Sequence, residues 1–123
     1  MPTPRPGAPV RGSETGRPLM AALDLLGRRW SLRVIWELRD GALGFRPLQQ
    51  RCDGMSSSVL RQRLTELLEA HIVGQLPDSR YELTPLGDQV YRALRPLIRW
   101  ADQWAAELSA PTGRRRASAR KRQ

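Results

Sequence analysis

A helix with one polar side, followed directly by a short hairpin, restricts the fold more than any other feature of this sequence. The segment 56–68 spaces its leucines so that they gather on one side of a helix: Leu60, Leu64, Leu67 and Leu68. The opposite side carries hydroxyl, guanidinium and amide groups from Ser58, Arg61, Gln62 and Thr65. Ser56 or Ser57 is suited to cap the first turn, where free N–H groups favour phosphate. The predicted helix therefore has an apolar side for a core and an outer side whose groups can bond base edges and phosphates.

Two short apolar runs, residues 73–76 and 80–83, follow this helix with Pro77-Asp78-Ser79 between them. Short apolar runs on both sides of a turn sequence predict a tight two-stranded hairpin. A polar-faced helix followed by a hairpin is the element order of a winged helix, in which the helix enters the major groove of DNA. Arg80, at the hairpin tip, then either meets a phosphate or the minor groove, or is an ordinary solvated turn residue.

Composition divides the 123 residues into a flexible basic head (1–18), a central domain (19–108) and a disordered basic tail (109–123). The net charge of +9 is unevenly distributed, because the head carries +2 and the tail +6, which leaves +1 for the central domain. The tail arginines can neutralise phosphates without reading sequence, touch acidic membranes, or simply keep the chain in solution. The candidates for non-specific phosphate contact are Arg114, Arg115 and Arg116.

The remaining elements predict a mainly α fold with a small β-hairpin, a winged helix-turn-helix. We expect helices at 19–28 and 32–39, the second capped by Ser31, and a brief strand at Leu43 and Phe45. A short helix from Pro47 to Cys52 precedes the polar helix, and Gly41 is suited to a left-handed helix end. A long last helix runs from Pro85 to Leu108 behind a Thr84 cap, and Pro96 predicts a bend within it.

The last helix carries an apolar seam whose residues are spaced 4, 3, 4, 3 and 4 apart: Val90, Leu94, Leu97, Ala101, Trp104 and Leu108. Such a seam is typical of a packed helix pair. It either closes on the domain's own core or packs against a second copy. A central domain of about 90 residues buries a modest core, so the dimer is favoured, with the first helix contributing to the interface.

Four segments resemble the HxlR-type branch of winged-helix transcriptional regulators, which is related to the MarR group. Residues 22–31 (ALDLLGRRWS) look like that family's "ALDLLGGKWT", and residues 39–45 are similar to its "L-x-x-G-x-x-R-F". Residues 55–64 (MSSSVLRQRL) are close to "ISQRVLTQRL", and 81–87 (YELTPLG) match "YSLTELG". The resemblance spans about residues 18–108, with the segments in the family's order and spacing, and Pro96 falls where the family also bends its last helix.

The resemblance implies a cytoplasmic, nucleoid-associated bacterial homodimer that binds an inverted-repeat operator in double-stranded DNA. The helix of about 56–70 would read the major groove beside a short wing at 73–83. The predicted DNA-binding residues are Ser57, Ser58, Arg61, Gln62, Arg63, Thr65, Arg80, Arg46 and Gln49. The predicted dimer-interface residues are Leu19, Leu23, Leu94, Leu97, Ile98 and Trp104. Many family members carry a reactive Cys-Pro pair before the first helix, where this chain has Arg17-Pro18, so that route of thiol sensing is in doubt.

Other chemistry finds little support in the sequence. Cys52, the only cysteine, is expected to be a buried structural thiol, with a redox sensor as the alternative because Arg51 is close by. His71 has no ligand-spaced partner, so neither a metal nor a cofactor is expected. The four tryptophans are expected to pack the core and interface, although a flat aromatic effector between protomers is an alternative. No catalytic motif, membrane span or secretory signal is evident, so we expect no enzyme. The competing hypothesis is a winged-helix module for protein–protein contact whose tail binds DNA non-specifically.

Overall fold

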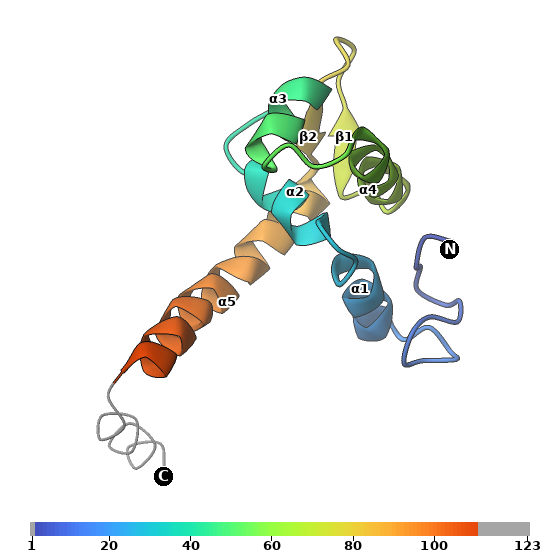
Figure 1. The fold of residues 1–123 in the computed structure, drawn as a ribbon. Coiled ribbons are helices and arrows are strands. Elements are labelled where there is room, and N and C mark those ends of the chain that lie inside the picture. Colours follow the sequence, from blue (N-terminus) through green and yellow to red (C-terminus); the bar gives the residue numbers. More distant parts are fainter. Residues whose placement is uncertain (1, 111–123) are drawn as a thin grey trace. The chain divides into compact units, whose positions relative to one another are not determined.

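The structure is a computed structural model, and it describes residues 2–110. Five helices and one hairpin follow each other in the order α1 (Pro18–Leu26), α2 (Ser31–Glu37), α3 (Phe45–Arg51), α4 (Ser57–Glu69), β1 (Val73–Gln75), β2 (Tyr81–Leu83) and α5 (Pro85–Ser109), as Figure 1 shows. The chain divides into two compact units at residues 91 and 92, within α5, and each unit is described by itself. The predicted class, mainly helical with a winged helix-turn-helix, is confirmed.

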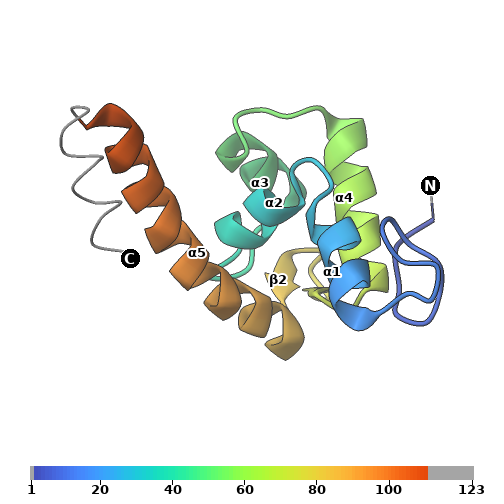
Figure 2. The ribbon, with the colours of Figure 1, turned by 90° about the horizontal axis from the view of Figure 1, so that it is seen from below.

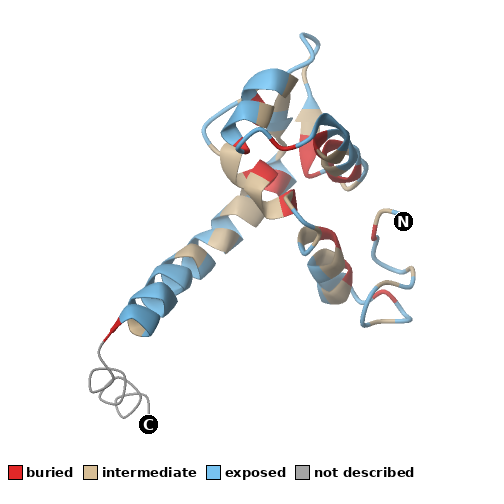
Figure 3. Ribbon diagram, viewed as in Figure 1, coloured by how far each residue is buried: buried red, intermediate tan, exposed pale blue. Residues whose placement is uncertain are grey.

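The first unit is built around α2, which contacts α1, α3 and α4 (Figure 2). Its core is a set of fully or almost fully buried aliphatic side chains: Val34, Ile35, Leu38, Leu48, Leu60, Leu64, Leu67 and Val73. Figure 3 marks buried residues in red on the helices of this unit and on its hairpin. Leu60, Leu64 and Leu67 are each at most 2% exposed, so the predicted apolar side of α4 is confirmed as a core face.

The hairpin pairs β1 with β2 antiparallel, and Val73 lies opposite Leu83. Leu43 joins it through one bridge to Tyr81, with reciprocal backbone hydrogen bonds of 2.9 and 2.8 Å. The strand predicted near Leu43 is therefore confirmed as a single bridge, whereas Phe45 already begins α3. The proline at position 47 is the third residue of this helix. It is tolerated there because the N–H groups of a helix's first turn have no helical acceptor, so the N–H that proline lacks is not missed.

Two serines were predicted to cap helices, and only one does so. The Ser56 hydroxyl accepts a hydrogen bond of 3.2 Å from the backbone N–H of Val59 and caps α4. At α2 the cap position falls on Trp30, which has φ 77°, and Ser31 lies inside the helix with its hydroxyl buried and without a hydrogen-bond partner. The prediction of a Ser31 cap was wrong. The left-handed turn at Trp30 makes the helix start at Ser31, one residue earlier in the chain than predicted.

The start of α5 is fixed to the hairpin by the predicted cap, Thr84. Its hydroxyl donates to the His71 carbonyl at 2.6 Å and accepts from the Gly87 N–H at 3.0 Å. A Cβ at buried Gly87 would lie 2.0 Å from the Ile72 carbonyl oxygen, so only glycine allows this close approach. The helix continues through Pro96 without interruption.

The head forms hydrogen-bonded turns, including a 2.9 Å bond from the Gly7 N–H to the Gly16 carbonyl and a bridge between Val10 and Ser13. Its predicted flexibility stays a prediction. The tail arginines Arg114, Arg115 and Arg116 lie outside the described residues.

Candidate nucleic-acid interface

The outer face of α4 is polar and free of the core. Five polar residues of this face are exposed: Ser57, Ser58, Arg61, Gln62 and Thr65. On the opposite side Leu60, Leu64 and Leu67 are buried, and Leu68 is half-buried. The helix starts next to the short turn that follows α3, so α3 and α4 form a helix-turn-helix pair (Figure 1). This arrangement presents hydroxyl, guanidinium and amide groups on one rigid element, which is what direct reading of base edges requires.

One flank of this face is tied to α3. The Gln49 side chain donates to the Ser57 hydroxyl at 3.0 Å and to the Met55 carbonyl at 2.8 Å. The Arg61 guanidinium lies 5.0 Å from the centre of the Phe45 ring, a cation–π distance. Gln49 therefore serves first as a brace between the two helices, and its role toward DNA stays a prediction.

A depression of about 400 Å³ lies between this flank and the hairpin. Its walls include Phe45, Arg46, Gln49, Ser57, Arg61 and Tyr81. Arg46 and Arg61 line it with two guanidinium groups, against the one carboxylate of Asp78. A concave surface with excess positive charge beside a polar helix is a suitable seat for a phosphate backbone.

At the hairpin tip, Arg80 is already engaged. Its Nε donates to Asp78 Oδ2 at 2.8 Å, and both side chains are at least half exposed. A hydrogen bond from the backbone N–H of Arg80, followed by one from its guanidinium, lowers the pKa of Asp78. An exposed pair of this kind is weak, so it does not prevent Arg80 from turning to a phosphate.

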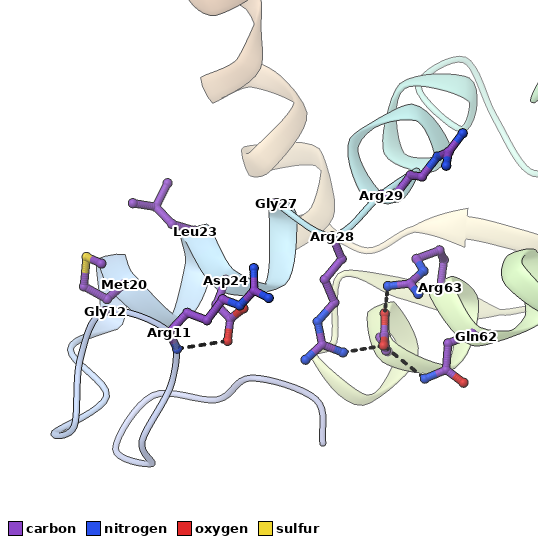
Figure 4. A pocket seen from close by; sticks show the side chains of 11 residues that line it. Arg11, Gly12, Met20, Leu23, Asp24, Gly27, Arg28, Arg29, Gln62 and Arg63 are labelled. Carbon is purple, nitrogen blue, oxygen red and sulfur yellow. Dashed lines mark hydrogen bonds and ion pairs between the residues drawn. The ribbon is translucent and has the colours of Figure 1, made fainter. Parts of the chain in front are cut away.

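The other flank of α4 contains a buried carboxylate. Glu66 is 1% exposed, and it accepts hydrogen bonds from Arg28, from Gln62 at 3.1 Å and from Arg63 at 2.9 Å. Figure 4 shows the three donors converging on it. Arg63 is half-buried and paired with Glu66, so it does not belong to the proposed DNA-binding set.

Sequence reasoning missed the Glu66 cluster. The spacings Gln62–Glu66 and Arg63–Glu66, four and three residues apart on one helix, were a local signal for it. The Arg28 partner had no such signal, because Arg28 lies 38 positions away and reaches α4 only through the tertiary fold.

The predicted interface residues are partly exposed apolar side chains. In α1, Leu19 and Leu23 are 68% and 55% exposed. In α5, Leu97 and Trp104 are exposed, Leu94 and Ile98 are half-buried, and the Trp100 and Trp104 rings stack with centroids 5.6 Å apart. Trp100 and Leu108 add to the apolar surface of the second unit, although the predicted interface set left them out.

Cys52 is fully buried at the end of α3. Burial raises the pKa of its thiol to about 11, and nearby Arg33 offsets only part of this. Among residues 2–110 no group of three or more potential metal ligands occurs. Over the same residues, every helix is too short or too polar to cross a bilayer.

A helix-turn-helix pair, a wing hairpin and a polar outer helix face together define a winged-helix protein of the DNA-binding class. The sequence model described as "HxlR-like helix-turn-helix" matches residues 25–109. The chain belongs to this family of DNA-binding transcriptional regulators, which are not enzymes.

Relatives and solved structures agree with this placement. The HTH-type transcriptional regulator YodB of Bacillus subtilis is 32% identical over 90 residues, which cover 68% of this chain and 80% of YodB. The crystal structure of quinone-bound YodB matches with a TM-score of 0.66 and 31% identity, covering 70% of this chain and 96% of that one. The crystal structure described as that of "a possible HxlR family transcriptional factor" from Thermoplasma volcanium matches with a TM-score of 0.63 and 26% identity. The match covers 69% of this chain and 82% of that one.

Proposed function

We propose that this chain is a homodimeric, sequence-specific DNA-binding regulator that places α4 in the major groove and the β1–β2 wing beside it. The observation that carries the proposal is the division of α4 into two sides. One side buries three leucines, Leu60, Leu64 and Leu67, while Ser58, Arg61 and Thr65 are exposed on the other. The proposed contact set is Ser57, Ser58, Arg61, Gln62 and Thr65, with Arg46, Gln49 and Arg80 toward phosphates. Such a protein would act on the nucleoid in the cytoplasm.

Exposed apolar side chains on α1 and α5 support the homodimer. A single chain leaves Leu19, Leu97 and Trp104 more than half exposed, and water disfavours apolar surface of this size. A two-fold dimer would address an inverted repeat whose half-sites lie about 34–36 Å apart, one helical turn of DNA.

We infer that regulation of this chain does not run through a thiol. YodB has been crystallised with a quinone and after diamide treatment. In this chain the only cysteine is buried and its pKa is raised to about 11, whereas reactive thiols need exposure and a lowered pKa. An effector, if the chain has one, would therefore bind without a covalent bond to cysteine.

The test is a double substitution, Arg61→Ala with Gln62→Ala. We expect it to abolish the preference for the operator over unrelated DNA at fixed salt while the dimer stays intact, because base contacts specify and phosphate contacts position. Gln103→Ala, at an exposed amide of α5, is the matched control and should keep the preference. Unchanged operator selectivity in the double variant would overturn the assignment of α4.

The competing hypothesis, a protein-docking module, is disfavoured by the same surface. Docking helices usually present aromatic or aliphatic anchors. In α4 no large apolar side chain is exposed.

We further propose that the tail binds phosphates without reading sequence, since it carries five arginines and one lysine. Deleting residues 112–123 should lower affinity for all DNA sequences about equally and flatten the salt dependence of binding. A loss restricted to one sequence would contradict this role.

A further inference from the structure

Glu66 constrains a side chain that the proposed function places on DNA. Gln62 is exposed on α4, yet its Nε2 lies 3.1 Å from Glu66 Oε2. The same oxygen receives Arg28, and the other carboxylate oxygen receives Arg63 at 2.9 Å. The Glu66 side chain is 2% exposed, so donors from α4 and from the turn between α1 and α2 hold an acceptor that water hardly reaches.

The chemistry of this contact fixes which way the Gln62 amide points. A carboxylate paired with two arginines can only accept hydrogen bonds, so the amide atom next to it must be the NH₂ group. Turning the amide over would place its carbonyl oxygen against a carboxylate oxygen. Figure 4 shows the nitrogen of Gln62 facing the cluster and its oxygen facing away. The outward side of Gln62 therefore offers its oxygen and one remaining N–H.

One donor and one acceptor match adenine and oppose guanine. In the major groove adenine presents the N7 acceptor beside the N6 donor, while guanine presents two acceptors, N7 and O6. A free glutamine can offer both N–H groups to guanine. When one N–H is held by Glu66, the carbonyl oxygen of Gln62 would face guanine O6 without a proton between them.

We propose that Glu66 is a specificity-determining positioning residue, which locks the Gln62 amide so that it accepts adenine and rejects guanine at one position of each half-site. The inference rests on the proposed function and deepens it. Glu66 acts through Gln62 and itself touches no base, and Arg28 links the lock to the turn between α1 and α2.

The experiment uses the full chain and an operator obtained by selecting bound fragments from random DNA. Dissociation constants are measured at one salt concentration for operators with each base pair replaced in turn. For the wild type we expect one position per half-site at which an operator with adenine is bound about tenfold or more tightly than the operator with guanine. Gln62→Ala should remove that preference and so identify the position, while Arg61→Ala should change a different position.

Glu66→Gln is the decisive variant, because a neutral amide at position 66 can donate or accept and leaves both orientations of Gln62 open. We expect the adenine-to-guanine ratio at the Gln62 position to fall toward 1, with the ratios at all other positions unchanged. Glu66→Asp is the second variant, since it keeps a charge for the arginines but draws the carboxylate back from Gln62. It should lower the adenine-to-guanine ratio at the same position. Circular dichroism is the control for the folding of each variant.

The outcomes separate the inference from the function it rests on. If the Glu66 variants weaken every operator equally and keep the ratio at the Gln62 position, Glu66 is merely structural and the inference is overturned. The inference is equally overturned if Gln62→Ala alters no single position while Arg61→Ala does, although the proposed function then survives. If the wild type shows no operator preference, the proposed function falls and the inference with it.

Discussion

The outer face of α4 and the outer face of the distal half of α5 are both exposed, yet they are built from opposite chemistry. On α4 the exposed groups are the hydroxyls, guanidinium and amide of Ser58, Arg61, Gln62 and Thr65. On α5 they are large apolar groups, Leu97, Trp100, Trp104 and Leu108, each more than half exposed. A polar face is well solvated in water, and it binds specifically only to a partner with matching polar groups. An apolar face is stabilised by any partner that removes it from water.

The difference teaches that exposure alone does not define a binding site. The α4 face has charge and hydrogen-bonding groups that match a duplex, and the α5 face has the seam spacing that matches another helix. The two faces should therefore respond to different substitutions.

The largest effect is expected from charging the α5 face. Leu97→Glu with Trp104→Glu should give a monomer, because two carboxylates from each protomer would be buried in the dimer interface. Operator affinity should then fall by about 10²- to 10⁴-fold, since the two half-sites are no longer bound by one linked molecule. Light scattering reports the mass, and Gln103→Glu on the same helix is the control. A double variant that stays dimeric would break the comparison.

Next in size is the contrast between the two sides of α4. Leu64 is 2% exposed, so Leu64→Ala should lower the free energy of unfolding by about 2–5 kcal/mol through lost burial and a cavity. Thr65→Ala, one residue later on the exposed side, should change it by less than about 0.5 kcal/mol while weakening operator binding. Urea unfolding and DNA titration measure the two quantities. Equal losses of stability would mean that Thr65 is part of the core.

The two sides of α4 could be predicted from the sequence because the pattern that separates them is local. A spacing of three and four residues decides which of Leu60, Leu64 and Thr65 is buried, and the short distance along the chain also makes the Ser56 cap and the hairpin predictable. The start of α2 was not predictable in this way, since the spacing of apolar residues carries no signal for the left-handed turn at Trp30. Nor was the ion pair between Arg28 and Glu66, which forms only once the fold brings the turn between α1 and α2 next to α4.

The proposed dimer would depend on contacts that a single sequence does not encode as a local pattern. The seam in α5 favours packing against a second copy over closing on the domain's own core. Leu97 and Trp104 are exposed in the single chain, and the dimer stays a prediction. Which residues of the partner pack on them depends on the symmetry of the assembly, and spacing along one helix carries no information about it.

Cys52 is buried, in contrast to the two exposed faces, and its burial should slow alkylation of the thiol by about a hundredfold. Burial raises its pKa from 9.0 to about 11, so at pH 8 the reactive thiolate is about a hundred times scarcer than for an unshifted thiol. Iodoacetamide should therefore react at least about a hundredfold more slowly with the folded chain than with the chain in urea. Because deprotonation is favoured as pH rises, the rate should climb up to about pH 11. A fast reaction at pH 7 would reopen thiol sensing.

The smallest effect separates two serines at the start of α4. The Ser56 hydroxyl accepts from the Val59 N–H at 3.2 Å, so Ser56→Ala should cost about 1 kcal/mol of unfolding free energy by losing the cap. Ser58 is exposed inside the first turn, and Ser58→Ala should change stability by less than about 0.5 kcal/mol. Operator binding should be weakened more by Ser58→Ala than by Ser56→Ala, because Ser58 belongs to the proposed contact set. At temperatures well below the melting temperature, the Ser56→Ala variant is still folded and keeps its contacts. Thermal melts and titrations of the two variants measure both orders. If Ser58→Ala destabilised the fold and spared DNA binding, the outer face of α4 would begin later along the helix than we propose.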